Sequence, residues 1–354
     1  MRSPLHDQLV ASGAELGEYS GAETALHFAS SPEEEYRQLV SEAAIYDLSW
    51  RAKIAVTGDD RVRWMNGMVT NNIRDLQPGH GNYNFLLNAK GQILSDLYIY
   101  NRGESLWIDA EKSQAPRLLE TLDHFIIMDD VELTDISEKI AAIAIQGPKS
   151  KQMLEAAGIP VPQLEPMQYS DVTWQGFGIT ITHMASPDFE TYEIWSGAEN
   201  IHYVWNALAE NGAAPVGTRA LEIFRVMSGV PKYGQDIQER DLPQETGQEH
   251  ALNFTKGCYI GQEIVERIRS RGAVHRVFSG FVVTSGEPAP GAKLSAEGKD
   301  NIGIITSVQS VPTKEDAART LCLGYIRREV VERGSKITFE GGSVEPHALP
   351  FTTG

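Results

Sequence analysis

The spacing of apolar positions along the chain predicts a mixture of helices and strands. Residues 31–44 begin with Ser31 as an N-cap and Pro32 at the first helical position, and apolar side chains then recur at helical spacing. Residues 200–212 and 218–229 show the same spacing, and each segment ends at a glycine, as helix C-termini often do. We therefore expect an amphipathic helix in each of these segments.

A strand, a glycine turn and a helix follow one another twice. Residues 53–68 place Gly58 after an apolar strand, with Asp59 as the cap of the following helix. Residues 141–158 place Gly147 in the same role about 90 residues later. The repeat predicts two related α+β modules.

Residues 81–100 alternate apolar and polar side chains on either side of turn residues 88–91, which predicts a β-hairpin. In its second strand, the alternation places Asp96 on one face together with Tyr98 and Tyr100. A carboxylate among aromatic side chains is partly desolvated and suits proton handling or hydrogen bonding to a ligand N–H. The alternative, an aspartate that faces water at a sheet edge, stays open on this pattern alone.

Glu193 and Arg225 raise the same question. Glu193 lies between Tyr192 and Ile194 in an aromatic, strand-like segment, so its carboxylate is either solvated or an acceptor for a ligand. Arg225 follows apolar residues in the helix predicted for 218–229. Its guanidinium is either an ordinary solvent-exposed charge at the end of a buried aliphatic chain, or a bidentate donor to a carboxylate.

After residue 272 the pattern changes to short strands separated by turn residues, which predicts a small all-β C-terminal domain. Cys322 alternates with apolar neighbours in one of these strands, so we expect it in the core.

The composition limits the class of protein. A chain of 354 residues is expected to form two or three domains, and 41% hydrophobic with 22% charged residues is ordinary for a soluble globular protein. The net charge of −17 argues against general affinity for nucleic acid or an anionic membrane. Two distant cysteines, no secretory signal and no long apolar run favour a cytoplasmic protein.

The other cysteine, Cys258, occupies an unusual place. In "TKGCYIGQE" it lies between two glycines, two residues after Lys256 and just before a predicted helix, and both the lysine and the helix N-terminus stabilise a thiolate. From Lys256 to Arg276 the chain carries five basic and two acidic residues in an otherwise acidic protein. This segment is either a solvated helix face or an anion-binding site. Cys258 is either a reactive thiol or a packing residue.

Several catalytic motifs are missing. The sequence contains no P-loop, no dinucleotide-binding glycine motif, no H-E-x-x-H and no G-x-S-x-G, and its nine histidines show no metal-ligand spacing. Nucleotide hydrolysis, zinc proteolysis and serine esterase chemistry are poorly supported, and no metal site is expected.

The remaining motifs resemble a known superfamily. The segments "TNNIRDLQPG", "YNFLLNAKGQILSDLYIY", "IQGP", "YEIW" and "RVMSGVPKYGQD" are similar to the aminomethyltransferase (glycine cleavage T-protein) superfamily, from about residue 30 to the C-terminus. "LPQE" followed by "NFTKGCYIGQEIV" resembles the signature of the YgfZ-type folate-binding proteins, a branch implicated in maintaining iron–sulfur enzymes.

The resemblance implies an α+β fold: a three-domain, T-protein-like cloverleaf with a ferredoxin-like first domain and a small C-terminal β-barrel. The implied domains are residues 1–52 with 138–230, residues 53–137 with 231–272, and residues 273–354. A monomer is expected.

The resemblance also implies that tetrahydrofolate is bound. Asp96 matches an aspartate near the reactive folate nitrogens, Glu193 matches a glutamate that binds the pterin ring, and Arg225 matches an arginine that faces the folate. The other implied binding residues are Tyr83, Tyr100, Tyr192 and Lys256. Asp96 and Cys258 are the implied catalytic residues.

Three functions follow from the resemblance. The first is a folate-binding accessory protein for iron–sulfur cluster assembly or repair, with Cys258 as its functional thiol and iron–sulfur proteins as partners. The alternative is an aminomethyltransferase that moves a one-carbon unit from a lipoylated carrier protein to tetrahydrofolate. The cysteine signature and the retained folate-site residue types rank the accessory function first, and Ser95 and Met227 stand where T-proteins commonly carry acids, which weakens the case for one-carbon transfer. A demethylase or oxidase that uses folate as one-carbon acceptor ranks third, because the sequence has no fingerprint for the flavin domain of such oxidases. Whether the protein catalyses a reaction is left open.

Overall fold

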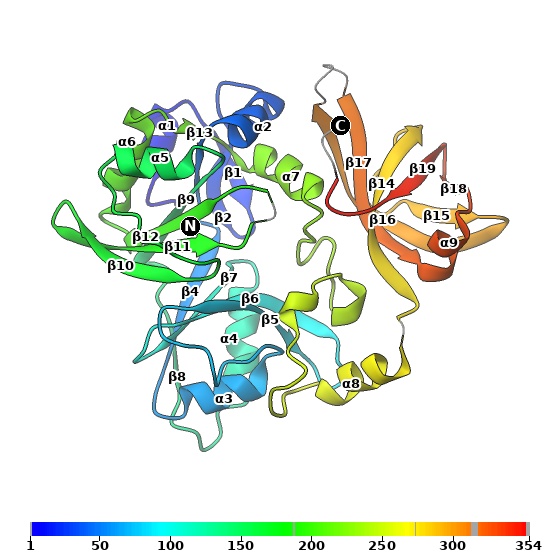
Figure 1. Cartoon of the computed structure of the whole chain (residues 1–354), viewed down its shortest axis with the longest axis horizontal. Coiled ribbons are helices and arrows are strands. Elements are labelled where there is room, and N and C mark those ends of the chain that lie inside the picture. The colour runs from blue at the N-terminus through cyan, green and yellow to red at the C-terminus, as the bar shows by residue number, and fades with distance from the viewer. Residues whose placement is uncertain (1, 187, 273, 313–317, 352–354) are drawn as a thin grey trace. The chain divides into compact units, whose positions relative to one another are not determined.

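The computed structural model describes residues 2–186, 188–272, 274–312 and 318–351 (Figure 1). Its helices are α1 (His6–Ala11), α2 (Pro32–Ser41), α3 (Arg61–Met68), α4 (Ala115–Asp123), α5 (Ser150–Ala156), α6 (Ile201–Glu210), α7 (Thr218–Met227), α8 (Gln262–Arg271) and α9 (Arg328–Arg333), with short 3-10 turns at Pro243–Glu245 and Glu249–Ala251. Over these residues, none of the helices has the length and apolar character needed to span a membrane.

The chain packs as two compact units. Unit 1 consists of Met1–Asn84 and Asp96–Leu221, and unit 2 consists of Phe85–Ser95 and Glu222–Gly354. The three domain ranges expected from the sequence stay a prediction.

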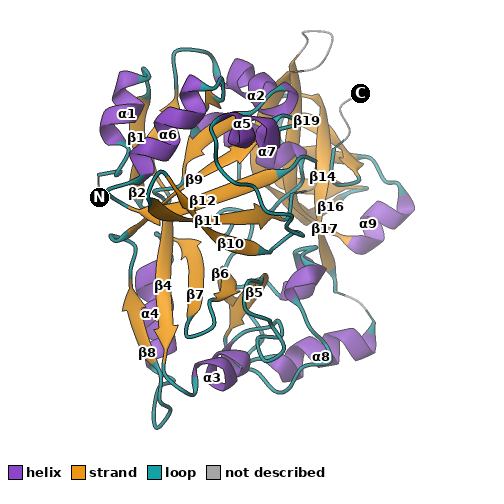
Figure 2. Ribbon diagram, turned by 60° about the vertical axis from the view of Figure 1, so that its left-hand side comes forward, coloured by secondary structure: helices purple, strands orange, loops and turns teal. Residues whose placement is uncertain are grey.

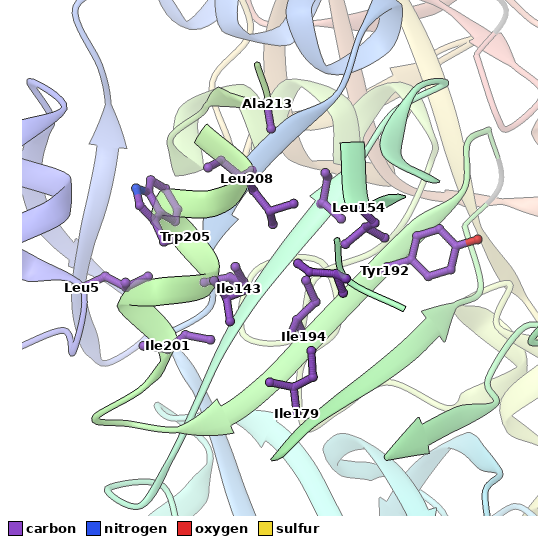
Figure 3. Packing of buried hydrophobic residues seen from close by; sticks show 14 of the residues in the cluster. Leu5, Ile143, Leu154, Ile179, Tyr192, Ile194, Ile201, Trp205, Leu208 and Ala213 are labelled. Atoms are coloured by element: carbon purple, nitrogen blue, oxygen red, sulfur yellow. The ribbon is translucent and has the colours of Figure 1, made fainter. Parts of the chain in front are cut away.

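Unit 1 contains a six-stranded sheet in the order β10-β11-β12-β9-β3-β13. Its strands are β3 (Ala44–Asp47), β9 (Ile140–Gln146), β10 (Tyr169–Trp174), β11 (Phe177–Met184), β12 (Thr191–Gly197) and β13 (Ala214–Pro215). Helices α1, α5 and α6 lie on one side of this sheet (Figure 2). Ile143 and Ile194 on the strands, and Leu154 and Trp205 on the helices, form one buried core there (Figure 3).

A second sheet has the order β5-β6-β7-β4-β8. Its strands are β4 (Arg51–Thr57), β5 (Gly81–Leu87), β6 (Ile93–Asn101), β7 (Leu106–Glu111) and β8 (Glu132–Asp135). One face carries Ile54, Ile99 and Ile108, all fully buried, and helix α4 lies along this sheet in both ribbon views. Because strand side chains alternate, Lys53, Tyr98 and Asp109 point to the other face.

The two strand–glycine–helix units predicted from the sequence are present. β4 leads into α3 through Gly58, and β9 leads into α5 through Gly147, with φ angles of +98° and +126°. The two units belong to different sheets. The predicted cap of α3 was wrong by one residue: Asp60 precedes the helix, and its carboxylate accepts hydrogen bonds from the Asp130 backbone and the Arg63 side chain rather than from the helix backbone.

The C-terminal strands close into a barrel in the order β14-β17-β16-β15-β18-β19, which confirms the predicted small β-barrel. These strands are β14 (Arg276–Ser285), β15 (Lys293–Ala296), β16 (Lys299–Pro312), β17 (Ala318–Arg327), β18 (Ile337–Phe339) and β19 (Gly342–His347). Cys322 lies fully buried in the barrel core, as predicted, and burial raises the pKa of its thiol to about 12. The mixed helix–strand fold class is confirmed as well. A two-stranded ribbon of β1 (Glu15–Tyr19) and β2 (Ala22–His27) completes the described strands.

Candidate functional site

The polar face of the five-stranded sheet carries most of the candidate residues of unit 1. Strand register places Lys53 on β4, Asp109 on β7 and Tyr98 on β6 in one row across the sheet. Asp96 precedes Tyr98 by two residues, so it lies on the same face. Tyr83 contacts this row, because the centre of its ring lies 5.0 Å from that of Tyr98.

Asp96 is held by two neighbours on this face. The Tyr83 hydroxyl donates a hydrogen bond to Asp96 Oδ2 at 2.9 Å, and Gln114 Nε2 donates to Oδ1 at 2.8 Å. The Asp96 backbone N–H donates in return to Gln114 Oε1 at 3.2 Å. These contacts fix the carboxylate in one orientation, because both of its oxygens are engaged. The structure thus brings together the predicted pair Tyr83 and Asp96.

Glu193 lies on β12 of the six-stranded sheet, on the face opposite the helices. Its neighbour across the strand pair is Ala144, and Trp195, two residues later, faces Ala142. The Trp195 indole N–H donates a hydrogen bond to Glu193 Oε2 at 2.8 Å. The carboxyl is 7% exposed, and burial together with the negative charge of Asp109 raises its pKa.

Tyr98 connects the two acids. Burial raises the pKa of the Tyr98 hydroxyl, and the negative charges of both Asp96 and Glu193 add to that shift. The two sheets meet in this region, because Trp195 of β12 stacks on Trp107 of β7 with ring centres 6.1 Å apart and packs edge-on against Tyr100 of β6 at 4.9 Å. Asp96 and Glu193 therefore flank the same polar region of unit 1, although they belong to different sheets.

An unsatisfied hydroxyl lies in this region. Thr182 on β11 is the cross-strand neighbour of Glu193. It is fully buried, and its Oγ1 has no hydrogen-bond partner among the described residues. A buried polar group without a partner costs free energy, so a ligand or water atom is expected beside it. Only the Trp195 indole donates to Glu193 among those residues, which leaves Oε1 open to a ligand N–H.

Two predicted aromatic residues have other roles. Tyr100 is fully buried, and its ring packs edge-on against that of Trp195 with the ring centres 4.9 Å apart. It therefore holds in place the indole that donates to Glu193. Tyr192 points to the opposite face of β12 from Glu193, because adjacent strand residues alternate. It lies in the core shared with helices α5 and α6 (Figure 3). Its ring stacks on that of His183 at a centre-to-centre distance of 5.1 Å. The structure therefore does not bring Tyr192 together with Glu193.

Arg225 belongs to unit 2, where protein groups occupy its guanidinium. Nη1 donates to Val230 O and to Asp236 Oδ2, each at 2.7 Å, and Nη2 donates to Ser307 Oγ at 2.8 Å. Nε donates to Glu222 Oε2 at 3.0 Å. The side chain thus ties helix α7 to the following loop and to β16, which is a structural role within this unit.

Cys258 is exposed, as a reactive thiol requires, and it precedes helix α8 as predicted. The Asn253 side chain accepts hydrogen bonds from the backbone N–H groups of Thr255 and Lys256, both at 2.9 Å, which shapes the loop before the cysteine. Lys256 itself is 9% exposed, and its ammonium lies 5.0 Å from the centre of the Tyr259 ring.

The positive segment around α8 is less positive than its sequence indicates. Arg276 pairs with Asp241 at 2.6 Å and with Glu245 at 2.9 Å, and both acids come from outside the segment. Arg269 lies over the Phe254 ring at 4.4 Å and pairs with Glu266 at 3.5 Å. The side chain of Arg271 lies outside the described residues. Acidic residues from outside the segment therefore neutralise part of the positive charge of the expected anion-binding site, which the local sequence could not reveal.

The sequence analysis missed the charged and indole groups around Glu193. Arg51, Lys53 and Asp109 form a buried ion cluster, and Trp107 stacks on Trp195 at 6.1 Å. One signal was present: Lys53 and Asp109 each occupy the centre of a short apolar strand, where a charge requires a buried partner. The described residues include no group of three His, Cys, Asp or Glu side chains placed to hold a metal.

Comparisons with known proteins agree with this architecture. The family model described as the GCVT N-terminal domain matches residues 5–256. The aminomethyltransferase of Staphylococcus saprophyticus is 24% identical over 343 residues, covering 96% of this chain and 93% of that protein. The aminomethyltransferase of Geobacillus kaustophilus is 26% identical over 362 residues, covering 99% and 97%.

A solved structure shows the same fold. The crystal structure of glycine cleavage system aminomethyltransferase T from Bartonella henselae has a TM-score of 0.90 at 22% identity, covering 100% of this chain and 98% of that one. The family match also corrects one expectation, since it begins at residue 5 rather than near residue 30. The N-terminal residues are indeed part of the fold, because Leu5 and Leu9 lie in the core of unit 1. The chain therefore belongs to the GCVT N-terminal domain family and, with it, to the aminomethyltransferase superfamily.

Proposed function

We propose that this protein binds tetrahydrofolate in unit 1, between the face that carries Asp96 and the face that carries Glu193. The observation that supports this proposal is the contact of Trp195, the neighbour of Glu193, with Trp107 and Lys53 on the sheet that carries Asp96, together with the unsatisfied Thr182 hydroxyl beside Glu193.

The chemistry of a pterin suits these residues. A pterin ring presents neighbouring N–H donors along one edge, and a carboxylate such as Glu193 accepts from them. Tyr98 supplies a flat aromatic surface on the facing sheet, which favours stacking with a flat ring. Asp96, fixed by Tyr83 and Gln114, is placed to accept a proton or hydrogen bond from a folate amine.

Glu193→Gln tests this proposal by calorimetric titration with tetrahydrofolate. Loss of a hydrogen bond to a charged acceptor costs about 1.5–3 kcal/mol, so the affinity should fall by roughly 10- to 150-fold. Glu199→Gln is the matched control, because Glu199 is exposed just beyond the end of β12. Equal affinities of the two variants would refute binding at Glu193.

The relatives point to one-carbon transfer as the reaction. The curated relatives are named aminomethyltransferases, and two of them match nearly the whole of this chain. In that reaction an aminomethyl carbon moves from a lipoylated carrier protein to tetrahydrofolate, and the amine leaves as ammonia. Asp96 would receive or hold the proton at the folate nitrogen. Ammonia release that requires both the loaded carrier and tetrahydrofolate, and that is lost in Asp96→Asn, supports this function.

A second candidate function has its own observation, the exposed Cys258 within the "KGCYIGQE" segment. It is the accessory role in iron–sulfur cluster assembly or repair, with the thiol as the working group. Complementation of cells that lack the protein separates the two functions. Restoration of iron–sulfur enzyme activity by wild type but not by Cys258→Ala supports the accessory role. Full restoration by Cys258→Ala removes the thiol from the mechanism.

A further inference from the structure

A buried ion cluster lies beside Glu193 in unit 1. The guanidinium of Arg51 donates through Nε to Asp109 Oδ1 at 2.7 Å, and the ammonium of Lys53 lies 2.8 Å from Asp109 Oδ2. Lys53 and Asp109 are each 1% exposed. Two cations on one carboxylate leave an excess positive charge away from water, and such a charge is costly unless another anion lies close by.

Glu193 is the second anion, and an indole connects it to Lys53. The Lys53 ammonium lies 4.6 Å from the centre of the Trp195 ring, and the N–H of that ring donates to Glu193 Oε2 at 2.8 Å. The cation–π contact holds the plane of the indole, and the plane of the indole fixes the direction of its N–H. Trp107 and Tyr100 pack on the same ring and restrict it further.

We propose that Lys53 is a positioning residue for Glu193: it fixes the carboxylate through Trp195 and offsets the negative charge of Asp109, so that Glu193 can be ionised when a ligand N–H arrives. The consequence for folate rests on the proposed function, whereas the effect on Glu193 does not.

The surroundings of Glu193 support this charge balance. Burial raises the pKa of Glu193, Asp109 raises it further, and Lys53 and Arg51 lower it. The hydroxyls of Tyr46, Tyr98 and Tyr100 also lie within range of its charge. A further acid, Glu111, acts on Arg51. Removal of Lys53 would leave Arg51 as the one cation among the groups named here that stabilise ionised Glu193.

The experiment titrates Glu193 directly in the full-length protein. Infrared spectroscopy detects the carbonyl stretch of a protonated carboxyl, and the band that disappears in Glu193→Gln belongs to this residue. Lys53→Met keeps the length of the side chain without its charge. It should raise the midpoint of the Glu193 titration by about one pH unit or more, as expected for loss of a nearby opposite charge.

Asp109→Asn provides the opposite change. It should lower the midpoint, and the double variant Lys53→Met/Asp109→Asn should return it toward that of wild type. An unchanged midpoint in Lys53→Met, or a rise in Asp109→Asn, would overturn the inference. If Lys53→Met does not fold, the direction of the shift in Asp109→Asn decides the question.

A second readout follows ligand binding. In Lys53→Met the affinity for tetrahydrofolate should fall about tenfold at neutral pH and recover at higher pH, a pattern that a merely structural defect would not produce. Lys53→Arg, which keeps the charge, should restore the wild-type profile. If wild type binds no tetrahydrofolate, the proposed function fails, and the infrared titration alone then supports or overturns the role of Lys53.

Discussion

Helix α8 is flanked by a glycine in the left-handed backbone region at each end, and the two glycines differ in their surroundings. Gly261 precedes the helix with a φ of +83°, and Gly272 follows it with a φ of +90°. A Cβ atom built on Gly261 would lie 2.6 Å from the carbonyl oxygen of Asn88 and 3.1 Å from Gly91 Cα. A Cβ atom on Gly272 would meet no atom within 4 Å among the residues that the structure describes.

We predict that Gly261→Ala destabilises unit 2 by about 2–5 kcal/mol. The left-handed conformation costs a non-glycine residue about 1–2 kcal/mol. The clash is with backbone that cannot easily move, because the Asn88 carbonyl accepts the Gly91 N–H at 2.9 Å within the hairpin turn. Overpacking of this kind adds about 1–3 kcal/mol. Gly272→Ala should cost the conformational part alone, about 1–2 kcal/mol.

Urea unfolding followed by circular dichroism measures the two losses, and hydrogen exchange of the peptide that covers α8 locates them. The sterically free Gly272→Ala acts as the matched control at the other end of the same helix. The reasoning is refuted if the two alanine variants lose the same stability, because the difference between them isolates the contact with residues 88–91.

Three further predictions concern the acids and thiols. Because the pKa of Glu193 is raised and ligand N–H groups require its ionised form, the affinity for tetrahydrofolate should rise as pH increases through that pKa, whereas Glu193→Gln should show a flat profile by calorimetry. Burial tends to raise the pKa of Asp109, but the charges of Arg51 and Lys53 outweigh burial and lower that pKa. The ionised Asp109 therefore stabilises the folded protein above its unfolded pKa, and this stabilisation is lost as pH falls through its folded pKa. Acid unfolding of Asp109→Asn should lack this pH-dependent loss. A thiol reagent should modify Cys258 alone in the folded protein and both cysteines in denaturant, because Cys322 is fully buried, and Cys258→Ala should remove the native reaction.

Local patterns in the sequence predicted much of the fold. Ser31 caps α2 by accepting a hydrogen bond from the Glu34 backbone, as expected from the N-cap signal. The alternation around Asp96 placed it on the polar face of β6, and the short strands after residue 272 predicted the barrel. These features depend on neighbours within a few positions, which periodicity and capping describe well.

The contacts around the candidate site were harder to predict, because they join strands that are distant in sequence. Lys53 and Asp109 are neighbours across β4 and β7, and Trp195 reaches them from another sheet. The resemblance to a known family identified Glu193 but could not show that Tyr192 faces the opposite side of the same strand. The Arg225 guanidinium likewise donates hydrogen bonds to Asp236 and Ser307, and no local pattern in the sequence reveals these contacts.

The division of the hairpin between the two units affects synthesis of the protein. Its tip, residues 85–95, belongs to unit 2, but the 126 residues from 96 to 221 separate it from the rest of that unit. At translation rates of about 5–20 residues per second, roughly 6–25 seconds pass between synthesis of the tip and synthesis of residue 222, where the rest of unit 2 begins. A single proteolytic cut also cannot release either unit whole, since the chain crosses from one to the other at residues 84, 95 and 221. Expression of residues 222–354 alone should therefore yield a fragment that lacks one of its own packing surfaces.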